Sequence, residues 1–170
     1  KVPSSRSWDL PFEMIKDISD QQPLIFLAAD LLLENVALFN KFIKKNKRYL
    51  DENNIFLFGI KPTMPSSEFG YFLTKKTKGN INKVSRFIEK PKEPRAKVII
   101  KNKGYWNSGI FFLRKDSIIN NFKKHQPKIF KKCNEAVTKA KYKDNIYYLD
   151  KKSFTKVNSK SFDFAILEKT

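Results

Sequence analysis

The sequence contains few of the residues that bind zinc or form disulfides. Its 170 residues include one cysteine, Cys133, and one histidine, His125. A single cysteine excludes an internal disulfide, and one cysteine with one histidine cannot complete a tetrahedral zinc centre. If the protein uses a metal ion, we therefore expect a hard cation held by carboxylates.

Long apolar runs are also absent. No apolar stretch approaches the roughly 20 residues that cross a bilayer, and the N-terminus lacks the charged-then-apolar order of a secretion signal. We therefore expect a cytoplasmic protein without a membrane partner. The first five residues, Lys1-Val2-Pro3-Ser4-Ser5, are typical of the interior of a loop, so we expect the chain to be part of a longer protein.

Acidic residues are half as numerous as basic ones. The chain has 17 Asp and Glu against 35 Lys and Arg, which gives a formal net charge of +18. Clustered cations favour nucleic-acid binding through counterion release. However, only five of these cations are arginines, and the lysines are spread over every expected helix. A solvated surface explains that spread about as well as a binding site does, so we do not expect nucleic acid as the partner.

The apolar content is sufficient for one globular domain, since 41% of the residues are hydrophobic and 14% are aromatic. The continuous apolar runs at 24–29 and 55–60 are typical of strands buried on both faces. Between them, residues 35–43 repeat apolar positions at helical spacing. This alternation predicts an α/β fold, with a Rossmann-like mixed, mostly parallel sheet flanked by helices.

The rest of the chain shows further local signals of strands, turns and helices. We expect a strand at 68–73 forming a hairpin with 83–88, a brief helix at 94–100, a polar turn at 105–109, an apolar strand at 110–113, and helices beginning at 116 or 117, at Pro127 and at Ser161. An earlier short helix is expected after Asp9.

The hairpin ends in an acid and a base. Glu89 and Lys90 precede Pro91, which cannot extend a strand and favours extended geometry in the residue before it. The two charges should therefore lie at the open end of a strand, where α/β sheets bind ligands. A carboxylate accepts sugar hydroxyls and an ammonium binds phosphate, which suits a sugar phosphate. These residues alone favour the alternative of an exposed strand end with two solvated charges.

Three other polar or small residues have two interpretations each. Asp30 follows a buried run and could cap the next turn or bind a cation. Gly70, inside an aromatic strand, indicates a bulge or a close approach of another group. Asn107 could contact a pair of sugar hydroxyls or cap its own turn.

Four stretches of the sequence carry a family resemblance. They are Phe58-Gly59-Ile60-Lys61-Pro62-Thr63 before Gly70-Tyr71, then Phe87-Ile88-Glu89-Lys90-Pro91, then Tyr105-Trp106-Asn107-Ser108-Gly109, and finally Asp163-Phe164-Ala165-Ile166-Leu167-Glu168-Lys169. In order and spacing, they resemble the nucleotidyltransferase domain of the mannose-1-phosphate guanylyltransferases, in the sugar-nucleotide pyrophosphorylase superfamily. The tryptophan-asparagine-serine-glycine stretch points to the mannose branch.

The resemblance implies a reaction and a set of site residues. The phosphate of mannose 1-phosphate would attack the α-phosphorus of GTP, giving GDP-mannose and pyrophosphate with Mg²⁺. The implied roles are metal binding and catalysis for Asp30, sugar-phosphate binding and catalysis for Lys90, hydroxyl binding for Glu89, sugar contacts for Gly70, Tyr71, Asn107 and Gly109, and nucleotide binding for Arg6 and Ser7. No role is assigned to Asp163 or Lys169.

The sequence also departs from the family pattern. The glycine-rich loop and the second metal-binding aspartate are not among these residues, so we expect residues 1–170 to be a partial domain that does not catalyse alone. Leu31 stands where the guanylyltransferases usually have histidine. Ser7 and Trp8 alter the base-recognition loop, so the identity of the nucleotide base is left open.

Two other functions therefore remain. One is a pyrophosphorylase for another sugar 1-phosphate or nucleotide, and the other is a non-catalytic basic relative that binds RNA or another polyanion. The sequence leaves the oligomeric state open, including a homo-oligomer.

Overall fold

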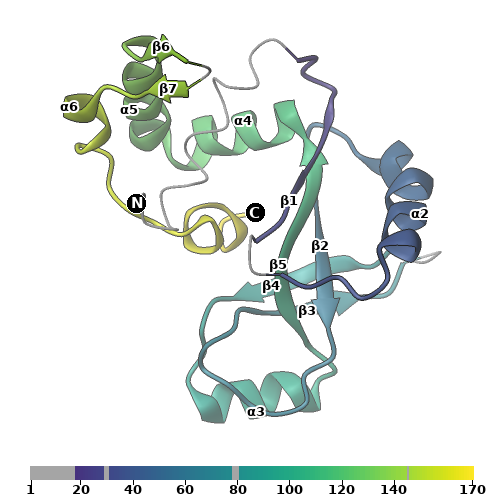
Figure 1. Ribbon diagram of the computed structural model, residues 1–170. Helices are drawn as coiled ribbons and strands as arrows, with labels where there is room; N and C mark the ends of the chain where they lie inside the picture. The colour runs from purple at the N-terminus through teal and green to yellow at the C-terminus, as the bar shows by residue number, and fades with distance from the viewer. Residues whose placement is uncertain (1–17, 29–30, 78–80, 145) are drawn as a thin grey trace.

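The computed structural model describes residues 18–28, 31–77, 81–144 and 146–170 (Figure 1). Its elements, in chain order, are β1 (Pro23–Phe26), α2 (Val36–Asn46), the 3-10 helix η2 (Lys47–Tyr49), β2 (Ile55–Ile60), β3 (Tyr71–Lys75), β4 (Lys83–Ile88), α3 (Glu93–Lys101), β5 (Tyr105–Arg114), α4 (Lys115–His125), α5 (Pro127–Thr138), β6 (Lys141–Lys143), β7 (Ile146–Tyr148), α6 (Lys151–Phe154) and the π-helix η3 (Asp163–Leu167).

The main sheet is built around β5. β1 pairs with the last four residues of β5, β2 pairs along most of the length of β5, and β3 pairs with the first two residues of β5 and with β4. The α/β class is confirmed, but a mostly parallel sheet is not, because each ladder in the described residues is antiparallel. β1 and β2 do run in the same direction, since each is antiparallel to β5 and β5 lies between them.

Helices cover both faces of this sheet (Figure 1). Successive side chains of a strand point to opposite faces. Phe111 on β5 therefore belongs to the larger core cluster with α4 and η3, whereas Phe112 meets Phe56 of β2 on the other face. On that second face, the ring of Phe58 packs against Phe39 and Phe42 of α2.

A second, smaller core lies between the β3–β4 hairpin and α3. Its buried members are Tyr71, Ile88, Ala96 and Ile99. The predicted hairpin and the brief helix after Pro91 are both confirmed. This core holds the start of β3 and the end of β4 together, at the edge where the polar motifs lie.

Local start signals agree with the structure. Asn35 caps α2, since its side-chain oxygen accepts a hydrogen bond from the Leu38 N–H at 2.8 Å. Pro127 begins α5, as expected for a residue without an N–H. The helix predicted after Asp9 lies outside the described residues. Within the described ranges, no helix is both long and apolar enough to span a membrane.

The predicted polar turn at 105–109 is wrong, because these residues form the first half of β5. The strand is nevertheless irregular there. On β2, Gly59 pairs with Asn107 and Leu57 pairs with Phe111. A step of two residues along β2 therefore corresponds to a step of four residues along β5. The additional residues form a bulge in which Gly109 adopts a left-handed φ of 74°.

Candidate functional site

Four of the predicted site residues meet at one end of the sheet. Gly70 precedes β3, Glu89 and Lys90 follow β4, and Asn107 lies near the start of β5. The strand registers align these positions, since Tyr71 pairs with both Ile88 and Trp106. The Asn107 backbone N–H donates to the Gly70 carbonyl oxygen at 2.7 Å.

Gly70 provides room for the Glu89 side chain. A Cβ atom at Gly70 would lie 2.5 Å from Glu89 Oε2 and 3.2 Å from Phe87 Cζ. Both distances are shorter than ordinary contacts. Of the two interpretations of this glycine, the structure therefore favours close approach, and the approaching group is a carboxylate of the site.

Glu89 is half-buried and has charged neighbours. Burial first, and the negative charge of Asp163 second, raise the pKa of Glu89 to about 7, although the Lys90 ammonium acts in the opposite direction. Near neutral pH this carboxyl is therefore divided between its neutral and ionised forms. It can donate to or accept from a ligand hydroxyl.

Lys90 does not have the extended backbone that we predicted from the following proline. Its φ is 41°, in the left-handed region, because β4 ends at Ile88 and the chain turns before the buried Pro91. A groove of about 520 Å³ lies at this turn. Lys90, Lys92 and Arg95 contribute cations to its lining, which also includes Glu89 and Glu168.

Asn107 is held by the bulge and by η3. Its Nδ2 donates to Asp163 Oδ1 at 2.9 Å, and its Oδ1 accepts from the Gly109 N–H at 3.4 Å. A Cβ atom at Gly109 would meet nothing within 4 Å, so this glycine is required by backbone conformation and not by space. The bulge thereby directs the Asn107 amide towards η3.

Two carboxylates complete the cluster, those of Asp163 at the start of η3 and of Glu168 directly after its end, and we had not predicted either as a site residue. Glu168 Oε1 accepts from the Glu89 backbone N–H at 3.1 Å. Burial raises the pKa of Asp163, whereas its bond from Asn107 opposes that shift. The only signal for these residues in the sequence was that their segment resembles a family motif.

Tyr71 faces away from the groove. Its side chain is fully buried in the smaller core. Its hydroxyl is 3.0 Å from both the N–H and the carbonyl oxygen of Ser66, donating to the carbonyl and accepting from the N–H. Any contact of this residue with a ligand would have to come from its backbone.

The remaining predicted residues, Arg6, Ser7 and Asp30, lie outside the described residues. In the part of the chain that is described, no group of three or more His, Cys, Asp and Glu side chains is arranged to hold a metal ion. Mg²⁺ stays a prediction that depends on Asp30.

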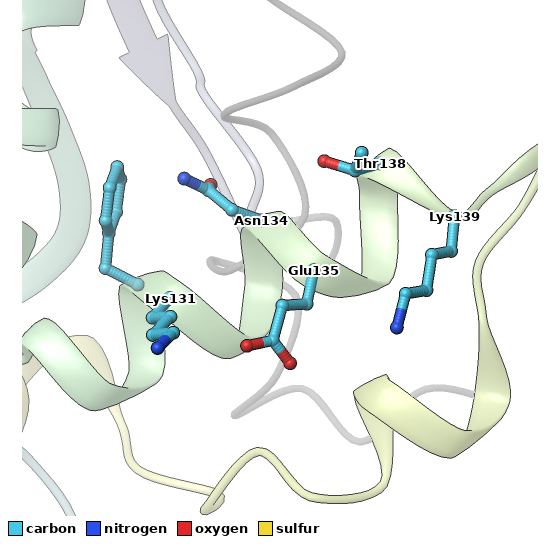
Figure 2. Close-up of a pocket in the computed structure, with 6 residues that line it drawn as sticks. Lys131, Asn134, Glu135, Thr138 and Lys139 are labelled. Carbon is cyan, nitrogen blue, oxygen red and sulfur yellow. The ribbon is translucent and has the colours of Figure 1, made fainter.

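Two other hollows are found on the described surface. One, of about 460 Å³, is lined by a single helix, α5, with Asn134 and Glu135 among its residues (Figure 2). The other, of about 940 Å³, lies between α2, β2 and the β3–β4 hairpin. None of the predicted site residues that the structure describes lines either hollow.

Comparison with known proteins identifies relatives that cover most of the chain. Residues 11–154 match the family described as "Nucleotidyl transferase". The mannose-1-phosphate guanylyltransferase RfbM of Salmonella typhimurium is 32% identical over 162 residues, which cover 94% of this chain and 34% of that protein. The xanthan biosynthesis protein XanB of Xanthomonas campestris pv. campestris is 32% identical over 148 residues, covering 86% of this chain and 32% of that protein. The chain thus spans about a third of the length of these curated relatives.

Two solved structures share the fold. The Helicobacter pylori protein described as mannose-6-phosphate isomerase superposes with a TM-score of 0.81 at 28% identity, covering 96% of this chain and 63% of that one. The Thermus thermophilus protein described as mannose-1-phosphate geranyltransferase gives a TM-score of 0.75 at 20% identity. This superposition covers 93% of this chain and 44% of that one. The second likeness concerns the fold alone.

Proposed function

Since the chain belongs to the nucleotidyl transferase family, we propose that Glu89, Lys90 and Asn107 bind the sugar phosphate of a nucleotidyl transfer reaction. The proposed substrate is mannose 1-phosphate. One of its phosphate oxygens attacks the α-phosphorus of GTP and forms the new P–O bond. The bond to the β-phosphate breaks, and the products are GDP-mannose and pyrophosphate.

The convergence of three polar groups beside Gly70 supports this proposal. A carboxyl and an ammonium that follow β4 line one groove, and the Asn107 amide on β5 lies beside the same glycine as the Glu89 carboxyl. Glu89 and Asn107 together offer donors and acceptors for adjacent hydroxyls, and Lys90 offers a point charge for the phosphate. The names of the relatives are consistent with this ligand, since RfbM is called a mannose-1-phosphate guanylyltransferase.

The reaction requires alignment and charge neutralisation more than proton transfer. In this proposal, Lys90 offsets the negative charge of the sugar phosphate as it approaches the triphosphate. Glu89 and Asn107 hold the ring, so that the attacking oxygen has one orientation. We also propose Mg²⁺ as the cofactor, with Asp30 as its ligand, and a cytoplasmic setting.

Titration calorimetry of the chain with mannose 1-phosphate tests the proposal. We expect binding that Lys90→Ala weakens by at least tenfold, whereas affinity for unphosphorylated mannose should not change. Lys101→Ala is the matched control, because it removes an exposed lysine from α3 that does not line the groove. Equal effects of the two variants, or no binding by the unaltered chain, would refute the assignment.

Competition and turnover assays address the remaining alternatives. Displacement of a labelled nucleotide by GTP, UTP, CTP and dTTP should favour GTP, and preference for another base would identify a different pyrophosphorylase. We propose that these 170 residues do not synthesise GDP-mannose alone, because their sequence lacks the glycine-rich loop. Salt-dependent RNA binding with no response to sugar phosphate would instead favour a polyanion-binding protein.

A further inference from the structure

The π-helix η3 begins at Asp163 and is followed directly by Glu168, and the carboxylates of these two residues contact two of the proposed ligand-binding residues. Asp163 accepts from the Asn107 side chain, and Glu168 accepts from the Glu89 backbone. We propose that Asp163 and Glu168 are positioning residues: Asp163 fixes the orientation of the Asn107 amide, and Glu168 fixes the turn that presents Glu89 and Lys90. This inference rests on the proposed function, because it names the residues that prepare the same groove for a sugar phosphate.

The Asn107 amide has two orientations of nearly equal shape, with its oxygen and nitrogen exchanged. An ionised Asp163 only accepts hydrogen bonds, so it favours the nitrogen on its side. The Gly109 N–H only donates, so it favours the oxygen on the other side. Both neighbours select the same orientation. Among the described bonds, this leaves one N–H and one oxygen lone pair of Asn107 for a ligand, which match two adjacent hydroxyls.

Glu168 acts on the neighbouring turn. Its Oε1 holds the N–H of Glu89, the residue directly before the left-handed Lys90. On the other side of Lys90, Pro91 is buried and fixes the direction of the chain. A lysine adopts a positive φ only when its surroundings impose it. The bond from Glu168, together with the buried proline, supplies that constraint.

The π-helix explains how one short segment reaches both targets. In an α-helix, residues five apart are separated by about 1.4 turns and point in different directions. Here the Glu168 N–H donates to the Asp163 carbonyl oxygen at 3.0 Å, which is the i to i+5 bond of a π-helix. The wider turn brings positions 163 and 168 to the same side of η3. Both carboxylates can then face the ends of β4 and β5.

An exchange of side chains tests the role of Asp163. We expect Asp163→Asn to weaken binding of mannose 1-phosphate by at least tenfold, since an amide at this position accepts either orientation of Asn107. The double variant N107D/D163N restores a hydrogen bond with donor and acceptor exchanged. It should recover the melting temperature but not the affinity. Recovery of both would show that the pair is only structural and would overturn the proposal.

Two substitutions separate the charge of Glu168 from its hydrogen bond. Glu168→Gln retains an oxygen that accepts from Glu89, so affinity should change by less than threefold. The pH dependence of mannose 1-phosphate binding should move to lower pH in this variant, because the Glu168 charge contributes to the raised pKa of Glu89. Glu168→Ala should weaken binding at least tenfold. Glu93→Gln is the matched control, since it removes an exposed carboxylate that pairs with Lys97 on α3. It should change neither the affinity for mannose 1-phosphate nor the pH dependence of binding.

A measurement without ligand keeps this inference separate from the proposed function. In NMR spectra of the ¹⁵N-labelled chain, Asp163→Asn should shift the Asn107 side-chain amide resonances, and Glu168→Ala should accelerate Glu89 amide exchange at least tenfold. If these changes occur but the unaltered chain binds no sugar phosphate, the positioning contacts are supported and the proposed ligand is wrong. If the chain binds the ligand but neither resonance responds, the positioning roles are refuted.

Discussion

Gly70→Ala should separate the stability of this domain from its ability to bind a ligand. The added Cβ atom would lie 2.5 Å from Glu89 Oε2 and 3.2 Å from Phe87 Cζ. Carbon and oxygen atoms that are not strongly bonded approach to about 3.3–3.6 Å. The carboxylate oxygen must therefore move by about 1 Å, and it moves out of the position in which it faces the groove.

The cost to folding should be small. Overpacking of a core usually costs about 1–3 kcal/mol. Here the nearest atom ends a flexible, half-buried side chain that can rotate away. Alanine also restricts the unfolded chain relative to glycine, which contributes about 0.5–1 kcal/mol in the opposite direction. We expect a net change within about 1 kcal/mol, or about 2–4 °C in Tm for a domain of this size.

The effect on binding should be much larger. A misplacement of about 1 Å in a site can cost about 100-fold in rate, so the Kd for mannose 1-phosphate should rise by at least about tenfold. Calorimetry measures the Kd, and circular dichroism during heating measures the Tm. The pair of measurements shows whether the alanine acts on the carboxylate or on the fold.

Gly104→Ala is the matched control. A Cβ atom there would lie 2.4 Å from Ile99 Cγ2 and 2.9 Å from the Ile99 backbone oxygen, inside the smaller core. The overlap is similar, but a buried branched side chain and a helix backbone cannot rotate away. We therefore expect this variant to lose more stability than Gly70→Ala. The reasoning is refuted if Gly70→Ala lowers the Tm as much as Gly104→Ala and leaves the Kd unchanged.

Three further predictions concern the same end of the sheet. The pKa of Glu89 is raised from 4.5 to about 7, so ionisation of this carboxyl destabilises the folded state. The difference in Tm between Glu89→Gln and the unaltered chain should therefore grow in favour of the variant between pH 4.5 and 7 and then level off. A difference that is constant with pH would contradict this prediction. Lys90 has a φ of 41°, so Lys90→Gly should be more stable than Lys90→Ala by about 1–2 kcal/mol in urea unfolding, while both variants lose phosphate binding equally. At Gly109, where φ is 74° and space is open, alanine should cost about 1–2 kcal/mol and asparagine less, and equal costs would exclude a conformational cause.

Much of the local structure could be predicted because its causes lie within a few residues. The Asn35 cap of α2 depends on a bond to Leu38, three residues later. Pro127 begins α5 because its ring and missing N–H are tolerated in a first turn. The β3–β4 hairpin follows from two alternating runs with turn residues between them.

The gathering of Gly70, Glu89, Lys90 and Asn107 at one edge could also be predicted in outline. These residues lie at or near the ends of strands, and the ends of neighbouring strands in a sheet lie together. Their assignment to a substrate, however, depended on the family resemblance. The Glu89-Lys90 pair alone favoured the alternative of solvated charges at a strand end.

The sequence by itself determined where most strands and helices lie, since apolar periodicity, caps and prolines act on neighbouring residues. Only the tertiary structure decided that β5 runs antiparallel between β1 and β2, that Tyr71 faces the core, and that the carboxylates of Asp163 and Glu168 reach Asn107 and Glu89. The bond between Glu89 and Glu168 joins residues 79 positions apart. Contacts of that kind depend on which surfaces pack together and which charges are buried, and no local pattern in the chain records them.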